Sequence, residues 1–254
     1  MQAFKQILTG DMYSRQEQLT FWDCDKFMRV RPAAILSKIA VFGGYHYDAL
    51  GYPRERLMEA GFVFLLSRIA VKFHRLPCSG EVLTVNTWEN GAKGAQVQRV
   101  FEMLDEEGRL CISAKSDWVL ADPHSHKMLR PSAFTLRELG KCPKEIDCPE
   151  PKKIVLPKEG LTDLGSREVV WSDLDGNGHL FSGNYGDIVW DYLPAELQSL
   201  PCREFAINYS REAMLGDNIS IRGCSAENGY LMEGAGANGV CFTARCTFTA
   251  GETY

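Results

Sequence analysis

The chain has 254 residues, of which 45% are hydrophobic and 24% are charged. This length accommodates one large domain or two small ones, each with a core of its own. The formal net charge of −5 argues against a general nucleic-acid binder, which needs a basic surface to neutralise phosphates. No run approaches the roughly 20 apolar residues of a membrane span, and the N-terminus lacks the apolar run and cleavage site of a signal peptide. We therefore expect a soluble protein of the cytoplasm.

The nine cysteines are scattered along the chain, odd in number and without a CxxC pair. A disulfide framework or a structural zinc site needs paired spacings, so we expect reduced thiols, most of them buried. We expect no metal and no other cofactor.

The first half of the chain predicts strand, helix and then strands. Residues 15–22 alternate apolar and polar side chains as a strand does. Pro32 suits the first turn of a helix, and the apolar residues after it recur on one helical face. Turn signals such as Asn90-Gly91 then separate four strand-like runs. These runs are residues 61–73, 81–88, 96–104 and 109–121.

The second half repeats this order. Residues 166–172 alternate as a strand, and apolar residues within 185–193 have the i, i+3, i+4, i+7 spacing of an amphipathic helix. Residues 73–85 align without a gap to 209–221, pairing a glycine and an acidic residue before each strand. We interpret the two halves as an internal duplication. The remaining predicted strands are residues 203–211, 217–225, 229–234 and 239–249.

Residues 123–164 contain six prolines among many charged residues and predict a connector on the outside. We therefore expect an N-terminal repeat at 1–122, a linker at 123–164 and a C-terminal repeat at 165–254. A long helix wrapped by a curved antiparallel sheet is an α+β arrangement known as the hotdog. Two of them in one chain predict a double hotdog.

The most unusual segment is WSDLDGNGHLFSGNY at 171–185, where a strand leads into the second helix. An extended backbone here would place every second side chain on one side. A helix beginning just after it would direct unpaired N–H groups at the same point, which suits a developing oxyanion. A neutral imidazole among these groups can act as a general base or polarise a carbonyl. The alternating residues are Asp173, Asp175, Asn177 and His179.

Two other interpretations of this segment are open. DLDGNG matches the first six positions of an EF-hand calcium loop, but position twelve is Asn184 instead of Glu. The preceding REVVW also predicts a strand where an EF-hand has a helix. Asp, Asn and Gly before a helix are, in addition, ordinary capping and turn residues.

The first repeat has no Asn, no His and no second carboxylate at the equivalent positions. Alignment of the halves, with one residue of slack, places Asp25, Phe27 and Arg29 opposite the last three members of the set. In the gapless segment, Leu76 falls opposite Glu212. We therefore predict that the second repeat carries the chemistry and that the first one binds.

With these motifs the chain resembles the acyl-acyl-carrier-protein (acyl-ACP) thioesterase family of bacteria and plastids. The first half carries the resemblance in LPCSGEVLTVNTW, RVFEMLDEEGRL and SDWVLADPHSHKMLRP. The second half carries it in SDLDGNGHLFSGNYGDIVWDYLP and YSREAMLGD. The resemblance implies hydrolysis of a fatty acyl-ACP thioester to the free fatty acid. It implies a catalytic set of Asp175, Asn177, His179 and Glu212.

The resemblance leaves the general base open among Glu212, Asp175 and His179. Asn177 and nearby backbone N–H groups would orient the carboxylate or stabilise the oxyanion. Family members often have a Cys after the Glu, and the Ala213 of this chain excludes a thiol mechanism there. The residues after the histidine, LFSGN, also differ from the V-N-N that the family prefers.

The resemblance also implies an acyl chain and a carrier protein as partners, with no nucleic acid and no membrane, and it leaves a homodimer open. The first repeat would hold the acyl chain, although the candidate side chains suit an ordinary core better. They are Ile35, Ile39, Phe42, Phe64 and Leu66. Acyl carrier protein is acidic, so a basic docking face is expected. Its candidates are Arg29, Arg31, Lys72, His74, Arg75, Lys127 and Arg130.

Two other function classes fit the same fold. One is an acyl-CoA thioesterase, which differs in the carrier that it accepts. The other is a non-catalytic acyl-binding protein or a dehydratase, neither of which releases a thiol from an acyl thioester.

Overall fold

The structure is a computed structural model, and it describes residues 5–125, 127–142 and 144–248. The chain divides into two units. The first consists of Met1–Arg31 and Lys38–Pro151, and the second of Pro32–Ser37 and Lys152–Tyr254. No helix in the described ranges is both long enough and apolar enough to cross a membrane.

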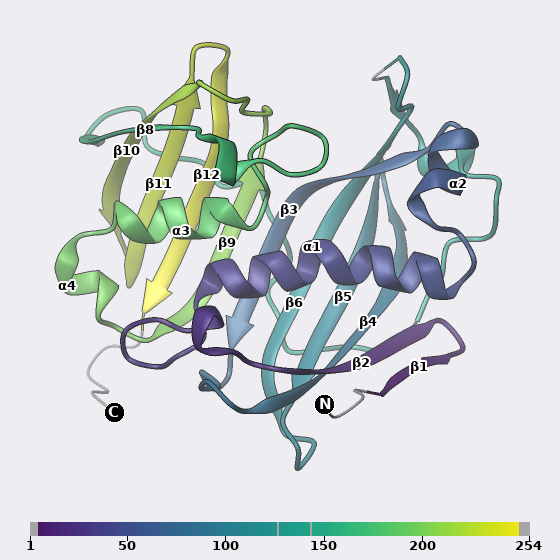
Figure 1. Ribbon diagram of the computed structural model, residues 1–254. Helices are drawn as coiled ribbons and strands as arrows, with labels where there is room; N and C mark the ends of the chain where they lie inside the picture. Colours follow the sequence, from purple (N-terminus) through teal and green to yellow (C-terminus); the bar gives the residue numbers. More distant parts are fainter. Residues whose placement is uncertain (1–4, 126, 143, 249–254) are drawn as a thin grey trace. The chain divides into compact units, whose positions relative to one another are not determined.

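An antiparallel sheet forms the bulk of the first unit (Figure 1). Its strands lie in the order β1-β2-β4-β5-β6-β3, with β7 beside β6. The strands are β1 (Gln6–Thr9), β2 (Met12–Gln18), β3 (Val63–Phe73), β4 (Val82–Lys93), β5 (Gln96–Leu104), β6 (Leu110–Ala121) and β7 (Met128–Leu129). The helices are α1 (Pro32–Ala49) and α2 (Arg54–Glu59), with short 3-10 turns at Phe21–Asp23 and Pro131–Ala133.

Helix α1 packs on this sheet through aromatic side chains. Pro32 occupies its first turn, where the missing N–H leaves no hydrogen bond unmade. Phe42 is buried and meets Tyr13 of β2 edge to face, with ring centroids 6.3 Å apart. Tyr47 packs against Phe64 of β3 at 5.3 Å. Burying one such ring stabilises the fold by roughly 1.5–3 kcal/mol, so the apolar stripe of α1 is a structural contact.

The second unit repeats the arrangement with a shorter helix. Its sheet has the order β9-β12-β11-β10-β8. Tyr185 of α3 packs edge to face on Tyr209 of β9 and Phe242 of β12, each at 5.4 Å. The elements are β8 (Thr162–Glu168), a 3-10 turn at Trp171–Asp173, α3 (Asn184–Asp191), α4 (Ala195–Gln198), β9 (Cys202–Tyr209), β10 (Asn218–Ala226), β11 (Gly229–Gly236) and β12 (Gly239–Phe248).

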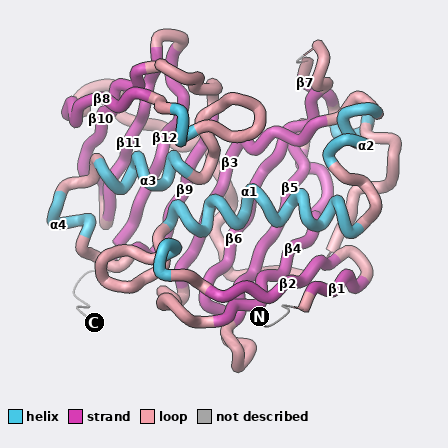
Figure 2. Tube along the Cα trace, in the orientation of Figure 1, coloured by secondary structure: helices cyan, strands magenta, loops and turns pink. Residues whose placement is uncertain are grey.

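The predicted fold class is confirmed, because each unit sets a helix against an antiparallel sheet in the hotdog manner. Within the expected linker, residues 144–161 contain no helix or strand (Figure 2). Met128–Leu129 nevertheless pair with β6, and β8 begins at Thr162. The domain bounds 1–122, 123–164 and 165–254 stay a prediction.

The first strand of each half lies a few residues earlier than its periodicity predicts. Residues 15–22 run into the 3-10 turn at Phe21–Asp23, and 166–172 run into the turn at Trp171–Asp173. The reason is a capping carboxylate, since Thr20 donates its N–H and its hydroxyl to Asp23 at 2.8 and 2.7 Å. Such a side chain competes with the strand ladder for the backbone.

The hairpin turn predicted at Asn90-Gly91 is wrong. Strand β4 continues to Lys93, and the register between β4 and β5 shifts between Glu89 and Ala92. Gly91 has a φ of +76°, and its N–H donates to the Gly140 carbonyl at 3.0 Å. The pair therefore forms a β-bulge, the other structure for which Asn and Gly are suited.

Each unit makes the same backbone hydrogen bonds at equivalent positions, which supports the internal duplication. Leu19 N donates to Glu81 O at 2.8 Å, and Gly80 N returns a bond to Leu19 O at 2.8 Å. In the second unit, Val169 N donates to Asp217 O and Gly216 N returns to Val169 O, at 2.8 and 2.9 Å. The gapless alignment of residues 73–85 with 209–221 thus corresponds to equivalent positions in space.

A charged cluster lies in the core of the first unit. Glu89 is 1% exposed and accepts hydrogen bonds from Tyr47 at 2.6 Å, Arg137 at 2.8 Å and the Gly140 N–H at 2.6 Å. Arg99 lies 3.4 Å from the same carboxylate. Burial alone would raise the pKa of Glu89, but the two guanidinium groups outweigh it and the pKa lies below its usual value. The carboxylate is therefore ionised in the core.

His46 of α1 stands beside this cluster. Its Nδ1 lies 2.8 Å from Arg99 Nη1, so the ring accepts a hydrogen bond and is neutral. Burial, followed by the positive charge of Arg99, lowers the pKa of His46 to about 3. An unfolded chain binds this proton near pH 6.5, so the free energy of unfolding should fall as the pH drops from 6.5 towards 3.

We expect His46→Gln to weaken that acid sensitivity, because glutamine offers Arg99 an acceptor that does not titrate. Urea unfolding at pH 7.5 and pH 5 measures the difference for both proteins. An equal loss of stability in the two proteins would show that other groups cause it.

Candidate active site

The polar segment of the second unit is a tight turn, and the expectation of an extended segment with four aligned side chains is wrong. Asp175 N donates to His179 O at 2.8 Å, and Gly178 N returns to Asp175 O at 3.0 Å. The Asp175 carboxylate captures the N–H groups of Asn177 and His179 at 2.8 and 3.2 Å. Gly178 completes the reversal with a φ of +79°, which glycine adopts without strain.

Asp173 differs from the other three in that its carboxylate has partners of its own outside the turn. It is buried, accepts a hydrogen bond from Arg167 at 2.6 Å and caps Val170 N at 3.0 Å. The carboxylates of Asp173 and Asp175 are thus engaged with the chain itself, unlike those of an EF-hand loop. In the part of the chain that the structure describes, no group of three or more His, Cys, Asp or Glu residues is arranged to hold a metal ion.

The structure brings His179 and Glu212 together. An antiparallel bridge joins His179 to Met214 and places the 210–214 segment beside the turn. As a result, His179 Nε2 lies 3.4 Å from Glu212 Oε2. The imidazole is 29% exposed and the carboxylate 59%, so water reaches both. Asn177 lies across the turn, with its amide Nδ2 3.3 Å from Asp175 Oδ2.

Two further residues complete the surroundings. Ala213 is fully buried, and its carbonyl accepts the Leu180 N–H at 2.8 Å, so this position anchors the turn. Burial raises the pKa of Tyr185 far above its usual value, and the negative charges of Glu212 and Asp175 add to that shift. Sequence periodicity placed Tyr185 in the helix core but gave no sign that the charges of both carboxylates act on it.

The first unit keeps the same turn without the same chemistry. Asp25 N donates to Arg29 O at 2.7 Å, and the Asp25 carboxylate accepts the N–H groups of Phe27 and Arg29 at 2.8 and 3.0 Å. Met28 takes the place of the glycine, with a φ of +65°. Arg29 pairs with Asp25 at 2.9 Å, where the second unit pairs histidine with glutamate.

A cavity of about 360 Å³ opens in the first unit between α1, α2 and the sheet. Of the five acyl-binding candidates, Phe64 lies in its wall. Ile39 and Phe42 are fully buried core residues, Ile35 is buried and counts with the second unit, and Leu66 is half-buried. Most of the wall comes from residues outside the predicted set, including Gly43, Tyr45, Leu57, Met58 and Trp118. The helical periodicity identified the buried stripe and missed the side of α1 that faces the cavity.

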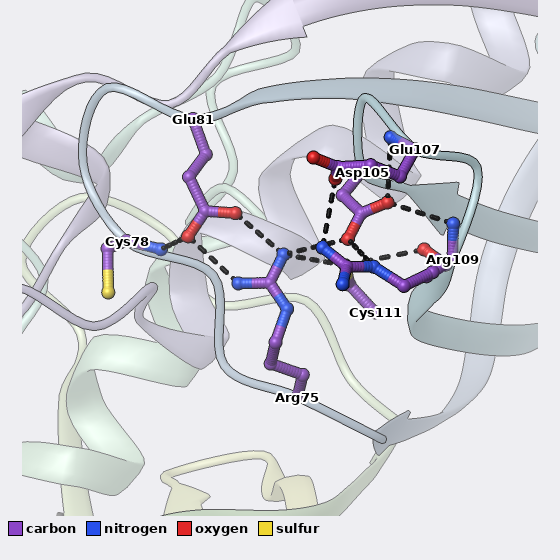
Figure 3. A network of polar contacts seen from close by, with 7 residues as sticks. All are labelled: Arg75, Cys78, Glu81, Asp105, Glu107, Arg109 and Cys111. Atoms are coloured by element: carbon purple, nitrogen blue, oxygen red, sulfur yellow. Dashed lines mark hydrogen bonds and ion pairs between the residues drawn. The ribbon is translucent and has the colours of Figure 1, made fainter.

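Most of the basic docking candidates have local partners. Figure 3 shows Arg75 bound to Glu81 at 2.6 Å and close to Asp105 at 3.5 Å. Lys72 pairs with Asp147 at 2.6 Å. Arg29 pairs with Asp25, Arg31 donates to the Trp22 carbonyl, and His74 contacts Ser113. The two remaining candidates, Lys127 and Arg130, are exposed.

Two family models match the chain. The acyl-ACP thioesterase N-terminal domain matches residues 10–132, and the acyl-ACP thioesterase C-terminal domain matches residues 163–233. Together they cover most of the chain. No sequence among the curated proteins matches it.

Three solved structures share the fold over nearly the whole chain. An acyl-ACP thioesterase from Bacteroides thetaiotaomicron has a TM-score of 0.82 at 22% identity, covering 94% of this chain and 98% of its own. A putative oleoyl thioesterase from Lactobacillus plantarum has a TM-score of 0.76 at 20% identity, covering 95% and 97%. The 12:0-ACP thioesterase from Umbellularia californica has a TM-score of 0.77 at 16% identity, covering 95% and 98%.

Proposed function

The chain belongs to the acyl-ACP thioesterase family and is a thioester hydrolase acting on acyl-ACP, and we propose that His179 and Glu212 carry out the hydrolysis. The observation that supports this assignment is the contact of 3.4 Å between His179 Nε2 and Glu212 Oε2 on a solvent-accessible turn. A carboxylate that accepts Nε2–H fixes the tautomer of the ring and leaves Nδ1 free to take a proton.

In the proposed reaction, His179 Nδ1 removes a proton from a water molecule whose oxygen attacks the carbonyl carbon of the thioester. Glu212 stabilises the imidazolium that forms. The tetrahedral oxyanion then collapses and expels the thiolate of the carrier's prosthetic group, which takes the proton back from the imidazolium. The products are the free fatty acid and the carrier thiol. The amide of Asn177 is an exposed side-chain donor within the turn, and we assign it to the oxyanion.

Asp175 has a positioning role in this scheme. Its carboxylate holds the N–H groups of Asn177 and His179, and Asp25 makes the same two bonds in a unit that lacks the catalytic set. Because these bonds are present in both units, and only one unit has the catalytic set, we assign them to holding the conformation of the turn.

We therefore expect Asp175→Ala to lower kcat/KM by about a hundredfold, since a misplacement of about 1 Å is enough for that loss. Asp175→Asn keeps the accepting oxygen and should retain most of the activity. Asp25→Ala is the matched control, because it removes the same bonds from the first unit. Steady-state kinetics on all three variants test the role; equal losses in the Ala and Asn variants of Asp175 would show that its charge takes part in the reaction.

The cavity of the first unit is the proposed acyl site, since it is lined mainly by apolar and aromatic side chains. Lys127 and Arg130 are exposed and are the proposed contacts to the acidic carrier. None of the nine cysteines, all of which lie in the described ranges, forms a disulfide, and this supports location in the reducing cytoplasm.

Thiol release measured with acyl-ACPs of increasing chain length, and with the matching acyl-CoAs, tests the function directly. We expect release from acyl-ACP with a higher kcat/KM than from acyl-CoA. Release from acyl-CoA but not from acyl-ACP would show that the substrate carrier is CoA and not the carrier protein. An acyl-binding protein or a dehydratase would release no thiol from either.

A further inference from the structure

The wall of the proposed acyl cavity contains a buried charged side chain. Arg99 lies in that wall and is 4% exposed. Its hydrogen bonds to the protein leave through the two terminal nitrogens, from Nη1 to His46 and Thr87 at 2.8 and 3.3 Å, and from Nη2 to Glu89 at 3.4 Å. A guanidinium group has five N–H donors, so these three bonds leave one N–H on Nη2 and the Nε–H. The Nε–H is the donor that lies towards Gly43 of α1.

Helix α1 leaves open space above this donor. Gly43 is buried in α1 and also lies in the cavity wall. A Cβ at this position would lie 3.6 Å from Arg99 Nε and 3.7 Å from Trp118 Cζ2. Because glycine has no side chain, the cavity extends to the guanidinium group. Glycine in the middle of a helix costs about 1 kcal/mol of stability relative to alanine. The stability of α1 therefore does not explain a glycine at position 43.

The charge of the cluster also favours an acceptor in the cavity. Arg99 and Arg137 both lie against Glu89, and the neighbouring His46 is neutral, so two positive groups share one carboxylate. A buried excess of positive charge is costly unless a further acceptor satisfies it. An oxygen atom in the cavity would do so.

The hotdog fold itself does not require this pair. Glu89 and Arg99 are cross-strand partners on β4 and β5. The gapless alignment extends along β4 and β10 and places Ser225 opposite Glu89, and the cross-strand partner of Ser225 is Tyr230. The second unit thus builds the same position with neutral side chains.

We infer that Gly43 and Arg99 form a polar subsite in the acyl cavity that recognises an oxygen atom carried by the acyl chain. The oxygen accepts the Nε–H of Arg99 in the space left by Gly43, while the rest of the chain lies against the apolar wall. The substrate class is therefore an acyl chain bearing a hydroxyl, keto or terminal carboxylate oxygen. This inference rests on the proposed function, because it takes the cavity to be the acyl site.

The test compares acyl-ACPs of equal length in three forms: unsubstituted, carrying a hydroxyl or keto oxygen at successive carbons, and carrying a terminal carboxylate. A hydrogen bond to a charged group predicts that at least one oxygenated substrate exceeds the unsubstituted one about tenfold in kcat/KM. The substrate that gains most distinguishes a neutral oxygen from a carboxylate. A ratio of one or less for every oxygenated substrate would overturn the inference.

Gly43→Ala places a methyl group over Nε and should bring the ratio close to one. Gly44→Ala is the matched control, because Gly44 follows in the same helix and also lines the cavity, but a Cβ there meets no atom within 4 Å and does not cover Nε. Arg99→Lys provides a second variant, since it keeps a cation beside Glu89 and replaces Nε–H with a methylene. A folded Gly43→Ala protein with the wild-type ratio would contradict the subsite. Absence of thiol release from every acyl-ACP, substituted or not, would instead contradict the proposed function.

Discussion

Replacing Glu212 with Gln is expected to lower kcat/KM for acyl-ACP hydrolysis by about 10²–10⁴-fold, the usual contribution of positioned general acid–base groups. The substitution would keep the size of the side chain but remove the charge that stabilises protonated His179. His179→Ala should cause a loss of similar size. Because the two groups act as one unit, the double variant should be little worse than either single variant.

Glu227→Gln is the matched control, since it neutralises another exposed carboxylate of the second unit. Thermal unfolding of each variant separates lost chemistry from lost structure. Normal turnover in both folded single variants would remove His179 and Glu212 from the active site. A double variant whose loss equals the product of the single losses would show that the two groups act independently.

Replacing Glu89 with Gln should destabilise the protein by about 3–5 kcal/mol, the range found when one member of a buried charge pair is removed. The carboxylate is 1% exposed, and its loss would leave the guanidinium groups of Arg99 and Arg137 without their shared anion. The amide of glutamine would also direct N–H donors at groups that are donors themselves. Urea unfolding measures the change as a shift of the midpoint at unchanged slope.

Glu150→Gln is the comparison for this effect. Burial would raise the pKa of Glu150, but its hydrogen bonds with Lys115 and Lys93 outweigh this and lower the pKa to about 2. The carboxylate is 43% exposed, however, and solvent screens its ion pairs, so we expect a loss below about 1 kcal/mol. Equal losses at positions 89 and 150 would contradict the structural interpretation of the buried cluster.

Much of the fold followed from periodicity, because side chains that face a core recur with the period of the element that carries them. The period near Pro32 predicted α1, and the spacing within 185–193 predicted α3. The hairpin at Asn90-Gly91 failed because the same two residues suit a bulge, and the choice depends on a contact with Gly140, which is far away in the sequence. Local sequence does not contain that contact.

Two of the predicted site residues, His179 and Glu212, lie together in the structure, but the shape of the site was not predicted. Alternation along Asp173, Asp175 and Asn177 suggested an extended strand, whereas the Asp175 side chain takes the backbone N–H groups that a strand would use. The subsite at Gly43 could not be predicted either. Gly43 is ordinary in a helix, and Arg99 is ordinary in a strand that alternates. The subsite becomes visible only in the folded chain, where Gly43 and Arg99 lie close together in the cavity wall.

The turn shared by the two units has a consequence for engineering. Asp25 and Asp175 hold it in the same conformation, although one turn has Met28 and Arg29 where the other has Gly178 and His179. The aspartate that fixes the conformation of the turn is therefore separate from the residues that react. A library that randomises positions 177 and 179 while keeping the aspartate and the glycine would sample new catalytic groups on a backbone that is already specified.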